Sequence, residues 1–150
     1  MAGTIGYLCS VKISTTTVTL IGSWSLDGIA ADQIDTSAFR DTWKTFEFGM
    51  KDGGTISFAG LYDPADTTGQ QALMNANLEN TDMATLRLYI DSTSYFEPCQ
   101  TTGYFSPTTA TGADTKVSHV NISGFNISAD KADVMKVDFT GKVSGVMVLV

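Results

Sequence analysis

The chain has 150 residues, of which 43% are hydrophobic and 17% are charged, and its formal net charge is −7. This length suits one domain, residues 1–150, with a core of its own, and the composition excludes a disordered chain. The nine basic residues are scattered along an acidic chain, which argues against tight binding to nucleic-acid phosphates.

In chain order, a short strand comes before a long segment that has no regular pattern. Val18 and Leu20 alternate with threonines, as in a half-buried strand. Residues 27–54 mix apolar, charged and glycine residues, and here we expect a long loop between early strands. Loops of this length are uncommon in compact domains and are usually functional or disordered.

The middle of the chain predicts two more strands and one helix between them. Ile56 and Phe58 alternate with other residues, and so do Leu86 and Leu88. The helix begins at Asp63-Pro64, because proline suits the first helical position, or slightly later with Thr68 as its cap, and it runs through Asn80. Its buried stripe consists of Ala72, Leu73, Ala76 and Leu78. Residues 92–115 are rich in Thr, Gly and Pro and predict a turn followed by a flexible connection.

The clearest pattern predicts a long antiparallel hairpin near the C-terminal end. Its apolar face carries Met135, Val137, Phe139, Gly141 and Val143. The opposite face carries Val134, Lys136, Asp138, Thr140 and Lys142. Residues 117–128 form the partner strand with a bulge at Ser123-Gly124, and residues 129–132 form the turn. These elements predict a mainly β fold, a β-sandwich or barrel with one flanking α-helix.

Motifs for catalysis, cofactors and metals are missing from the sequence. It has no nucleophile elbow, phosphate-binding loop, dinucleotide fingerprint or zinc-protease motif. A Ser-His-Asp triad would need the lone His119, which lies in a strand pattern. Cys9 and Cys99 are far apart and predict two free thiols rather than a zinc site. We therefore expect no enzyme, no cofactor and no metal.

Two pairs of aspartates also need an interpretation. Asp63 with Asp66, or Asp130 with Asp133, would suit an acid–base pair or a calcium site. Both pairs lie at predicted turns, where aspartate commonly accepts hydrogen bonds from the backbone. We expect the turn role at both places.

The long segment, residues 27–54, carries an unusual amount of apolar side chain. Trp43, Phe46 and Phe48 either fill the core of the domain or form an exposed patch that contacts a partner. An exposed patch would make this segment a self-association surface. The expected inter-subunit contacts are Phe39, Trp43, Phe46, Phe48, Met50, Lys51 and Asp52.

With these residues in order, the chain resembles the major tail tube proteins of long-tailed (siphovirus-type) bacteriophages. The resemblance rests on the stretch IGSWSLDGIAADQIDTSAF at residues 21–39, Trp43 with Phe46 and Phe48, and the turn GMKDGG at residues 49–54. It continues through ISFAG at residues 56–60, Asp63-Pro64 with a Gln-rich helix, and VDFTGKVSG at residues 137–145. It covers most of the chain and thins over residues 92–115.

The resemblance implies a subunit that assembles into hexameric rings, which stack into the tail tube of a virion. Strands of neighbouring subunits would join into a barrel around a channel through which DNA passes without specific binding, and the long loop would reach neighbouring subunits. Assembly would take place in the host cytoplasm, with tail tip and tail terminator proteins as further partners and no membrane binding. The polar face of the hairpin is expected to line the channel through Asn121, Ser123, Lys136, Asp138, Thr140 and Lys142. An acidic channel would repel DNA, although the two lysines weaken that expectation at these positions.

Two alternatives stay open. An inner-tube subunit of a contractile tail or of a type VI secretion-like system would share the ring architecture. A carbohydrate-binding or adhesin β-sandwich would instead need an exposed aromatic platform on a preformed site.

Overall fold

The computed structural model describes residues 9–100 and 118–150, and these residues are mainly β-strand. The strands are β1 (Ser10–Ile13), β2 (Thr16–Thr17), β3 (Ile21–Asp27), β4 (Ala30–Asp35), β5 (Phe46–Asp52), β6 (Thr55–Leu61), β7 (Asp82–Met83), β8 (Leu86–Tyr89), β9 (Tyr95–Pro98), β10 (His119–Ser128), β11 (Lys136–Ser144) and β12 (Met147–Leu149). The helix is α1 (Gln70–Leu78). The predicted mainly β fold with one helix is confirmed.

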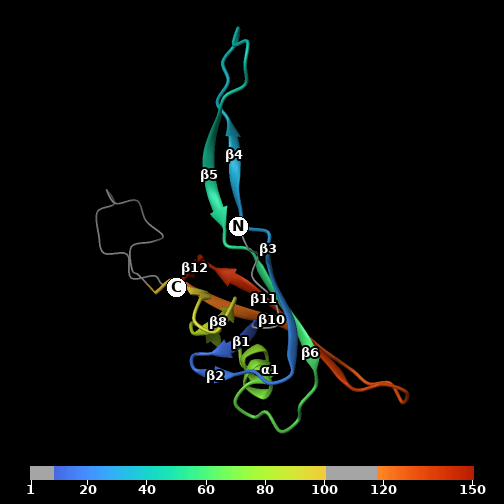
Figure 1. The fold of residues 1–150 in the computed structure, drawn as a ribbon. Helices are drawn as coiled ribbons and strands as arrows, with labels where there is room; N and C mark the ends of the chain where they lie inside the picture. The colour runs from blue at the N-terminus through green and yellow to red at the C-terminus, as the bar shows by residue number, and fades with distance from the viewer. Residues whose placement is uncertain (1–8, 101–117) are drawn as a thin grey trace.

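The strands form two five-stranded sheets and a separate two-stranded ribbon. One sheet has the order β12-β9-β8-β1-β2 and the other has the order β3-β6-β11-β10-β7. The ribbon pairs β4 with β5 and projects away from both sheets, as Figure 1 shows. Every strand pair is antiparallel.

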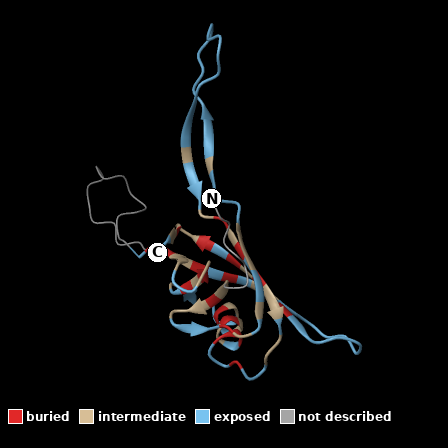
Figure 2. Cartoon of the chain, in the orientation of Figure 1, coloured by how far each residue is buried: buried red, intermediate tan, exposed pale blue. Residues whose placement is uncertain are grey.

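The core lies between the two sheets and α1, and its side chains come from all three (Figure 2). Its largest fully buried apolar side chains are Phe58, Phe139, Ile56, Leu73, Leu86, Leu88, Val11, Val120 and Val137. The rings of Phe58 and Phe139 stack across β6 and β11 with centroids 5.2 Å apart. Burial of these side chains supplies most of the free energy that holds the sheets together.

The C-terminal hairpin has the predicted alternation along β11, but Met135, predicted to lie on the apolar face, precedes the strand and is exposed. Residues Val137, Phe139, Gly141 and Val143 of β11 are buried, and the alternating side chains face outward. The strand β10 pairs along β11 with a shift between Ile122 and Gly124, where the bulge was predicted. A residue inserted there changes which side chains face the core, because strand side chains alternate between faces.

The helix begins later than the Asp63-Pro64 start that the sequence suggested. Its N-cap is Gly69, and neither Pro64 nor Thr68 caps it. The buried carboxylate of Asp66 instead accepts the backbone N–H groups of Gly69 and Gln70, both at 3.0 Å. Leu78, predicted to be buried, is exposed at the end of the helix.

Asp66 also ties the helix to the sheet, because it accepts the backbone N–H of Thr19 at 2.9 Å. Burial disfavours its charge, but the N–H donors of Thr19, Gln70 and Gly69 outweigh burial, so the pKa of Asp66 lies below its ordinary value of 3.8. The stabilisation is therefore present above about pH 4 and is lost as the pH falls further.

We expect Asp66→Asn to lower the free energy of unfolding by about 1–3 kcal/mol at pH 7, because an amide replaces a charged acceptor of three backbone donors. The difference from the wild type should shrink as the pH falls from about 5 to 2, because the wild-type carboxyl then becomes protonated. Urea denaturation across this pH range measures the effect. Asp130→Asn, at an exposed turn, is the control and should change little; an equal loss in both variants would contradict this role for Asp66.

Residues 27–54 are not the irregular loop that the sequence predicted. They contain β4 and β5, which pair as an antiparallel hairpin with a register shift between Ala31 and Gln33. Phe46, Phe48 and Met50 do alternate with a period of two, but both faces of the hairpin are exposed, so no buried face marks it as a strand.

Two smaller expectations also change. The strand β9 falls inside residues 92–115, which were predicted to be turn and connection, and residues 101–117 lie outside the described part of the chain. Leu20, predicted to lie in a strand, is exposed and has a positive φ of 58°.

Candidate assembly surfaces

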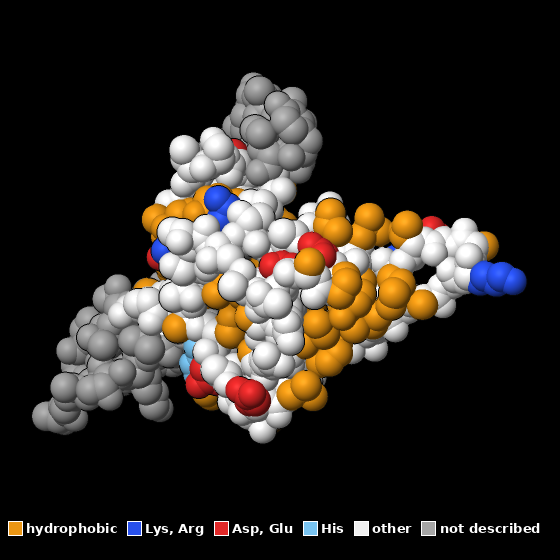
Figure 3. All heavy atoms as spheres, turned by 90° about the horizontal axis from the view of Figure 1, so that it is seen from below, with side chains coloured by type: hydrophobic (Ala, Val, Ile, Leu, Met, Phe, Trp, Pro, Cys, Tyr) orange, Lys and Arg blue, Asp and Glu red, His pale blue; other side chains and the backbone are white. Residues whose placement is uncertain are grey.

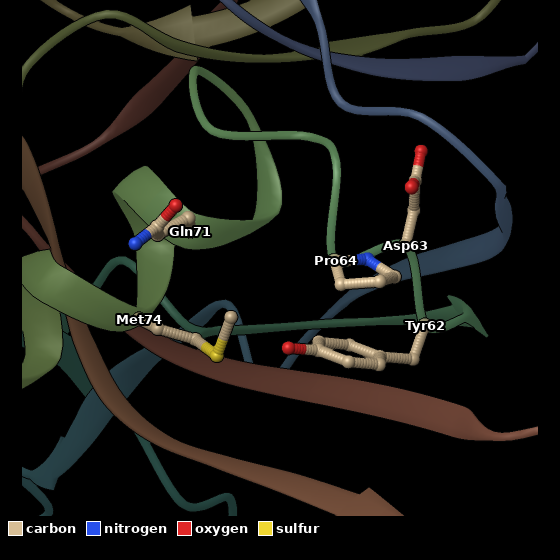
Figure 4. Close-up of a pocket in the computed structure, with 5 residues that line it drawn as sticks. All are labelled: Tyr62, Asp63, Pro64, Gln71 and Met74. Atoms are coloured by element: carbon tan, nitrogen blue, oxygen red, sulfur yellow. The ribbon is translucent and has the colours of Figure 1, made fainter.

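A small pocket lies beside α1, and its lining does not suit catalysis. The pocket has a volume of about 130 Å³ and is lined by Tyr62, Asp63, Pro64, Gln71 and Met74 (Figure 4). The Asp63 carboxylate is already occupied, since it accepts the Thr19 hydroxyl at 2.8 Å and the Ala65 N–H at 3.0 Å. The lining has no nucleophile paired with a general base.

The other groups considered for chemistry have structural roles. Asp130 and Asp133 accept backbone N–H groups at their turn, as expected. His119 lies on β10 with its Nε2 3.5 Å from an Asp82 oxygen, and Cys9 and Cys99 are free thiols. Across residues 9–100 and 118–150, no three His, Cys, Asp or Glu side chains come together as a metal site. The helix in this part of the chain is too short and polar to span a membrane.

The residues predicted to contact other subunits all lie on the β4–β5 hairpin, here called the arm (residues 30–52). Phe39 and Trp43 lie in its loop, and Phe46, Phe48, Met50, Lys51 and Asp52 lie on β5. The relative exposure of Trp43 is 82% and that of Phe48 is 75%, so neither ring belongs to the core. The interpretation in which these aromatics fill the core is wrong.

The loop of the arm is exposed along its whole length and is held by local hydrogen bonds. Thr36 N–H donates to the Thr45 carbonyl at 2.9 Å, and Thr45 N–H donates to the Ser37 hydroxyl at 2.8 Å. The Asp35 carboxylate accepts from Ser37, which lowers the pKa of Asp35. A two-stranded ribbon is at best marginally stable alone in water, so an arm of this kind gains from packing against a partner.

The base of the arm is fixed to the body by close backbone contacts. A Cβ on Gly53 would lie 2.0 Å from the Gly145 carbonyl oxygen, so only glycine allows this approach. Gly54 has a φ of 92°, and its carbonyl accepts the N–H of Val143 at 3.1 Å. Asp52 forms an ion pair with Lys142 of β11. These contacts set the direction in which the arm leaves the sheet (Figure 1).

The sheet that carries the arm has two long strand edges without partners among the described residues. The edge strand β3 pairs only with β6. On the other side β10 pairs with β7 only at Val120 and Asn121, and the Asn77 amide then donates to the Ile122 carbonyl at 2.7 Å. From Ser123 to Ser128 the outer edge of β10 has no strand beside it in residues 9–100 and 118–150. Exposed edges of this kind readily add a strand from another chain.

The residues predicted to line a channel share one face of this sheet. Lys136, Asp138, Thr140 and Lys142 lie on the face of β11 that points away from the core, and Asn121 pairs with Lys142 from β10. Ser123 is the extra residue of the bulge, and its hydroxyl donates to the Thr140 carbonyl at 3.1 Å.

Both lysines of this polar face are paired with carboxylates. Lys136 lies 3.3 Å from Asp133, and Lys142 pairs with Asp52. Hydrogen bonds from Lys142 and from the Gly54 N–H lower the pKa of Asp52, so its charge persists at neutral pH. The Asp138 carboxylate accepts a hydrogen bond from the Asn126 amide at 2.9 Å.

No protein-family model and no curated protein matched the sequence. Solved structures of assembled tails do match in fold. One is the tail of an empty gene transfer agent particle with C6 symmetry, 11% identical, with 99% of each chain covered and a TM-score of 0.71. Another is the virion of a native gene transfer agent particle, 12% identical, with 99% of each chain covered and a TM-score of 0.68.

A more distant match comes from a contractile system. It is the sheath/tube terminator of an extracellular contractile injection system in the extended state, 12% identical, covering 100% of this chain and 98% of the other, with a TM-score of 0.54. Identities this low relate the fold and not the individual residues. The chain therefore shares its fold with chains of these assembled particles.

Proposed function

We propose that this chain, as one domain of residues 1–150, is the structural subunit of a phage-type tail tube that conducts DNA. Copies form rings, hexameric as in the similar tail with C6 symmetry, and the rings stack into a tube. The observation that carries the proposal is the pair of free edges on the sheet that also carries the arm. The subunit is not an enzyme; its partners are its own copies and the tail tip and terminator proteins.

The strand directions support ring closure. In the sheet order β3-β6-β11-β10, each strand runs antiparallel to its neighbour. Three reversals separate β3 from β10, so these two strands run in opposite directions. The free edge of β10 in one copy can therefore pair antiparallel with β3 of the next copy. The same head-to-tail contact repeats around a ring until the sheet closes, and closure pairs the free edges of β3 and β10.

The polar face supports the role of a conduit. In a closed ring whose core lies outward, this face lines the channel, with Asn121, Ser123, Lys136, Asp138, Thr140 and Lys142 on it. The ammonium groups of Lys136 and Lys142 are paired within the chain, so they offer little attraction to DNA phosphates. Asp138, which accepts a hydrogen bond from the neutral Asn126 amide, repels a polyanion, which lets it slide.

The tail is proposed to be of the long, non-contractile type. The sequence resemblance over residues 21–39 and 49–60 supports this type, whereas the matched gene transfer agent structures and the matched terminator of a contractile injection system fit both types. Co-purification with a sheath protein would contradict it and support the contractile alternative. A carbohydrate-binding role is not favoured, because the exposed aromatics lie on a projecting ribbon rather than around a preformed hollow.

We expect purified protein to form rings and tubes in negative-stain microscopy as its concentration rises. On assembly, amide hydrogen exchange should slow by at least about tenfold in β3 and in residues 123–128, because the free edges become hydrogen bonded. Exchange in β11, which already has partners on both sides, is the control and should change little. A protein that stays monomeric with a tail-tip template, or tubes whose β3 amides still exchange freely, would overturn the proposal.

A further inference from the structure

Two glycines on the free edges of the sheet are not required by the fold of a single chain. Gly22 lies on β3 and Gly124 lies on β10. A Cβ added to Gly124 would meet nothing within 4 Å, and a Cβ added to Gly22 would lie 4.0 Å from its nearest neighbour, the Ala59 carbonyl oxygen. Neither glycine has the positive φ that favours this residue type. The single chain therefore gives no reason for glycine at either position.

Two glycines inside the same sheet differ in this respect. A Cβ on Gly141 of β11 would lie 2.8 Å from a Val120 side-chain carbon, and a Cβ on Gly60 of β6 would collide with the Leu20 carbonyl oxygen. Glycine inside a strand lowers stability, and it often marks a place where another backbone comes close. The two glycines on the free edges therefore indicate the approach of another chain.

Each of the two edge glycines lies at a β-bulge. Gly22 is the extra residue of β3, where the pairing with β6 shifts between Ile21 and Ser23. Gly124 follows Ser123, the extra residue of β10, where the pairing with β11 shifts. A bulge bends its strand and interrupts regular pairing. The two bulges therefore set one limit of the straight part of each free edge.

The straight parts of the two edges match in length and in pattern. Ser23–Asp27 of β3 and Gly124–Ser128 of β10 each have five residues with unbroken pairing to the next strand inside the sheet. In both stretches the second and fourth residues share the face of the core, and the other three share the polar face. Antiparallel pairing from end to end therefore keeps every side chain on its own face.

The apolar side chains of the two stretches are incompletely covered within one chain. Trp24, Leu26 and Phe125 are half-buried at the margin of the core. Ile127 is 40% exposed, and Figure 3 shows hydrophobic side chains gathered where the β10–β11 hairpin leaves the body. End-to-end pairing places Trp24 opposite Ile127. It also places Leu26 opposite Phe125, so both pairs lose exposed apolar surface.

Other registers of the same two stretches are less complete. A shift by one residue would turn the apolar side chains to the polar face, because strand side chains alternate. A shift by two residues keeps the faces but replaces two of the five pairs with bulge or turn residues. The end-to-end register also offsets each copy by two residues from its neighbour, because Trp24 and Phe125 lie at the same level within one chain. Closed barrels require such a stagger.

We propose that neighbouring copies join at a seam in which Ser23–Asp27 of one copy pairs antiparallel with Gly124–Ser128 of the next, and that Gly22 and Gly124 fix this register. This inference rests on the proposed function, because it specifies the strand contact that closes the ring. Each glycine lies at one end of the seam, where its missing side chain leaves room for the backbone of the other copy.

Larger side chains at the two glycines test their role in the seam. We expect Gly22→Val and Gly124→Val to fold with an unchanged or higher melting temperature, because the single chain leaves both sites open. The concentration needed for rings should rise at least about tenfold in sedimentation velocity. Ser57→Val is the matched control and should form rings like the wild type, since Ser57 lies on the exposed face of β6, which has partners on both sides. Gly22→Ala and Gly124→Ala are milder variants in case valine disturbs a bulge, and they should act in the same direction.

Pairs of cysteines test the register itself. The seam places Ser25 opposite Asn126 of the next copy. Within one chain these residues are three strand spacings apart, about 14 Å, which is too far for a disulfide. We expect Ser25→Cys combined with Asn126→Cys to give a ladder of linked subunits on denaturing gels after oxidation of preformed rings. Ser23→Cys combined with Asn126→Cys is the shifted pair and should give little linked product, because diagonal neighbours lie about 7–8 Å apart. The protein without added cysteines controls for Cys9 and Cys99.

Rings from both valine variants at the wild-type concentration would overturn this inference. Stronger linkage of the shifted pair, or no linkage of the matched pair in rings seen by negative-stain microscopy, would also overturn it. Slowed amide exchange in β3 of wild-type rings would in those cases leave the proposed function standing. A wild-type protein that forms no rings would instead overturn the proposed function, and the inference with it.

Discussion

Replacing Trp43 by aspartate is expected to abolish tube formation while the monomer keeps its fold and thermal stability. The Trp43 ring is 82% exposed and contacts no core residue, so its loss should change the free energy of unfolding by no more than about 0.5 kcal/mol. In an assembled tube the same ring would be buried, and removing an aromatic anchor of an interface commonly costs about 2 kcal/mol or more. Subunits in a tube make this contact many times, so the loss is repeated along the whole assembly.

The measurement compares polymer and monomer in the same samples. Sedimentation velocity and negative-stain microscopy report on tubes, and urea denaturation reports on the fold. Trp24→Phe is a useful contrast, because Trp24 is half-buried on β3, donates its indole N–H to the Tyr89 carbonyl at 3.2 Å and belongs to the core. It should lose some stability and still polymerise. If Trp43→Asp unfolds, or forms normal tubes, the arm is not the contact surface.

Replacing Phe139 by alanine is expected to cause the largest loss of stability, about 3–5 kcal/mol. Phe139 is fully buried and packs against Phe58 and Phe125, with ring centroids 5.2 and 6.2 Å away. It lies on the central strand β11, between β6 and β10, so neighbours on both sides would border the cavity. The surrounding sheet hydrogen bonds limit how far the cavity can collapse.

Urea denaturation with a two-state fit measures this loss. Ser57→Ala is the control, because Ser57 lies on the exposed face of β6, next to Phe58 in sequence and opposite Thr140. It should stay within about 0.5 kcal/mol of the wild type. A loss below about 1 kcal/mol for Phe139→Ala would mean that the core between the two sheets is looser than its burial indicates.

The hairpin and the arm show why one part of the fold could be predicted and another could not. In β11 the apolar residues alternate with charged ones, and one face packs against the core, so sequence and burial agree. In β5 the alternation of Phe46, Phe48 and Met50 has the same period, but no face packs against the chain itself. A period-two pattern predicts a strand most reliably when one face has a core to join.

The start of the helix and the exposure of Leu20 depended on distant contacts. Asp66 accepts N–H groups both from the start of α1 and from Thr19, which is 47 positions away. The exposure of Leu20 follows from its positive φ and from its hydrogen bond to β6. Local propensity carries no information about partners so far along the chain.

By itself, the sequence determined the mainly β class, the register and bulge of the C-terminal hairpin, the free thiols and the unusual apolar content of residues 27–54. These follow from alternation, spacing and composition, which are local properties of the chain. Only the tertiary structure decided that those apolar residues stand on a projecting arm, and that two sheet edges have no strand partner among the described residues. The physical reason is that burial and edge pairing depend on what the folded chain brings together, and here the apolar side chains and the edges are left for other copies.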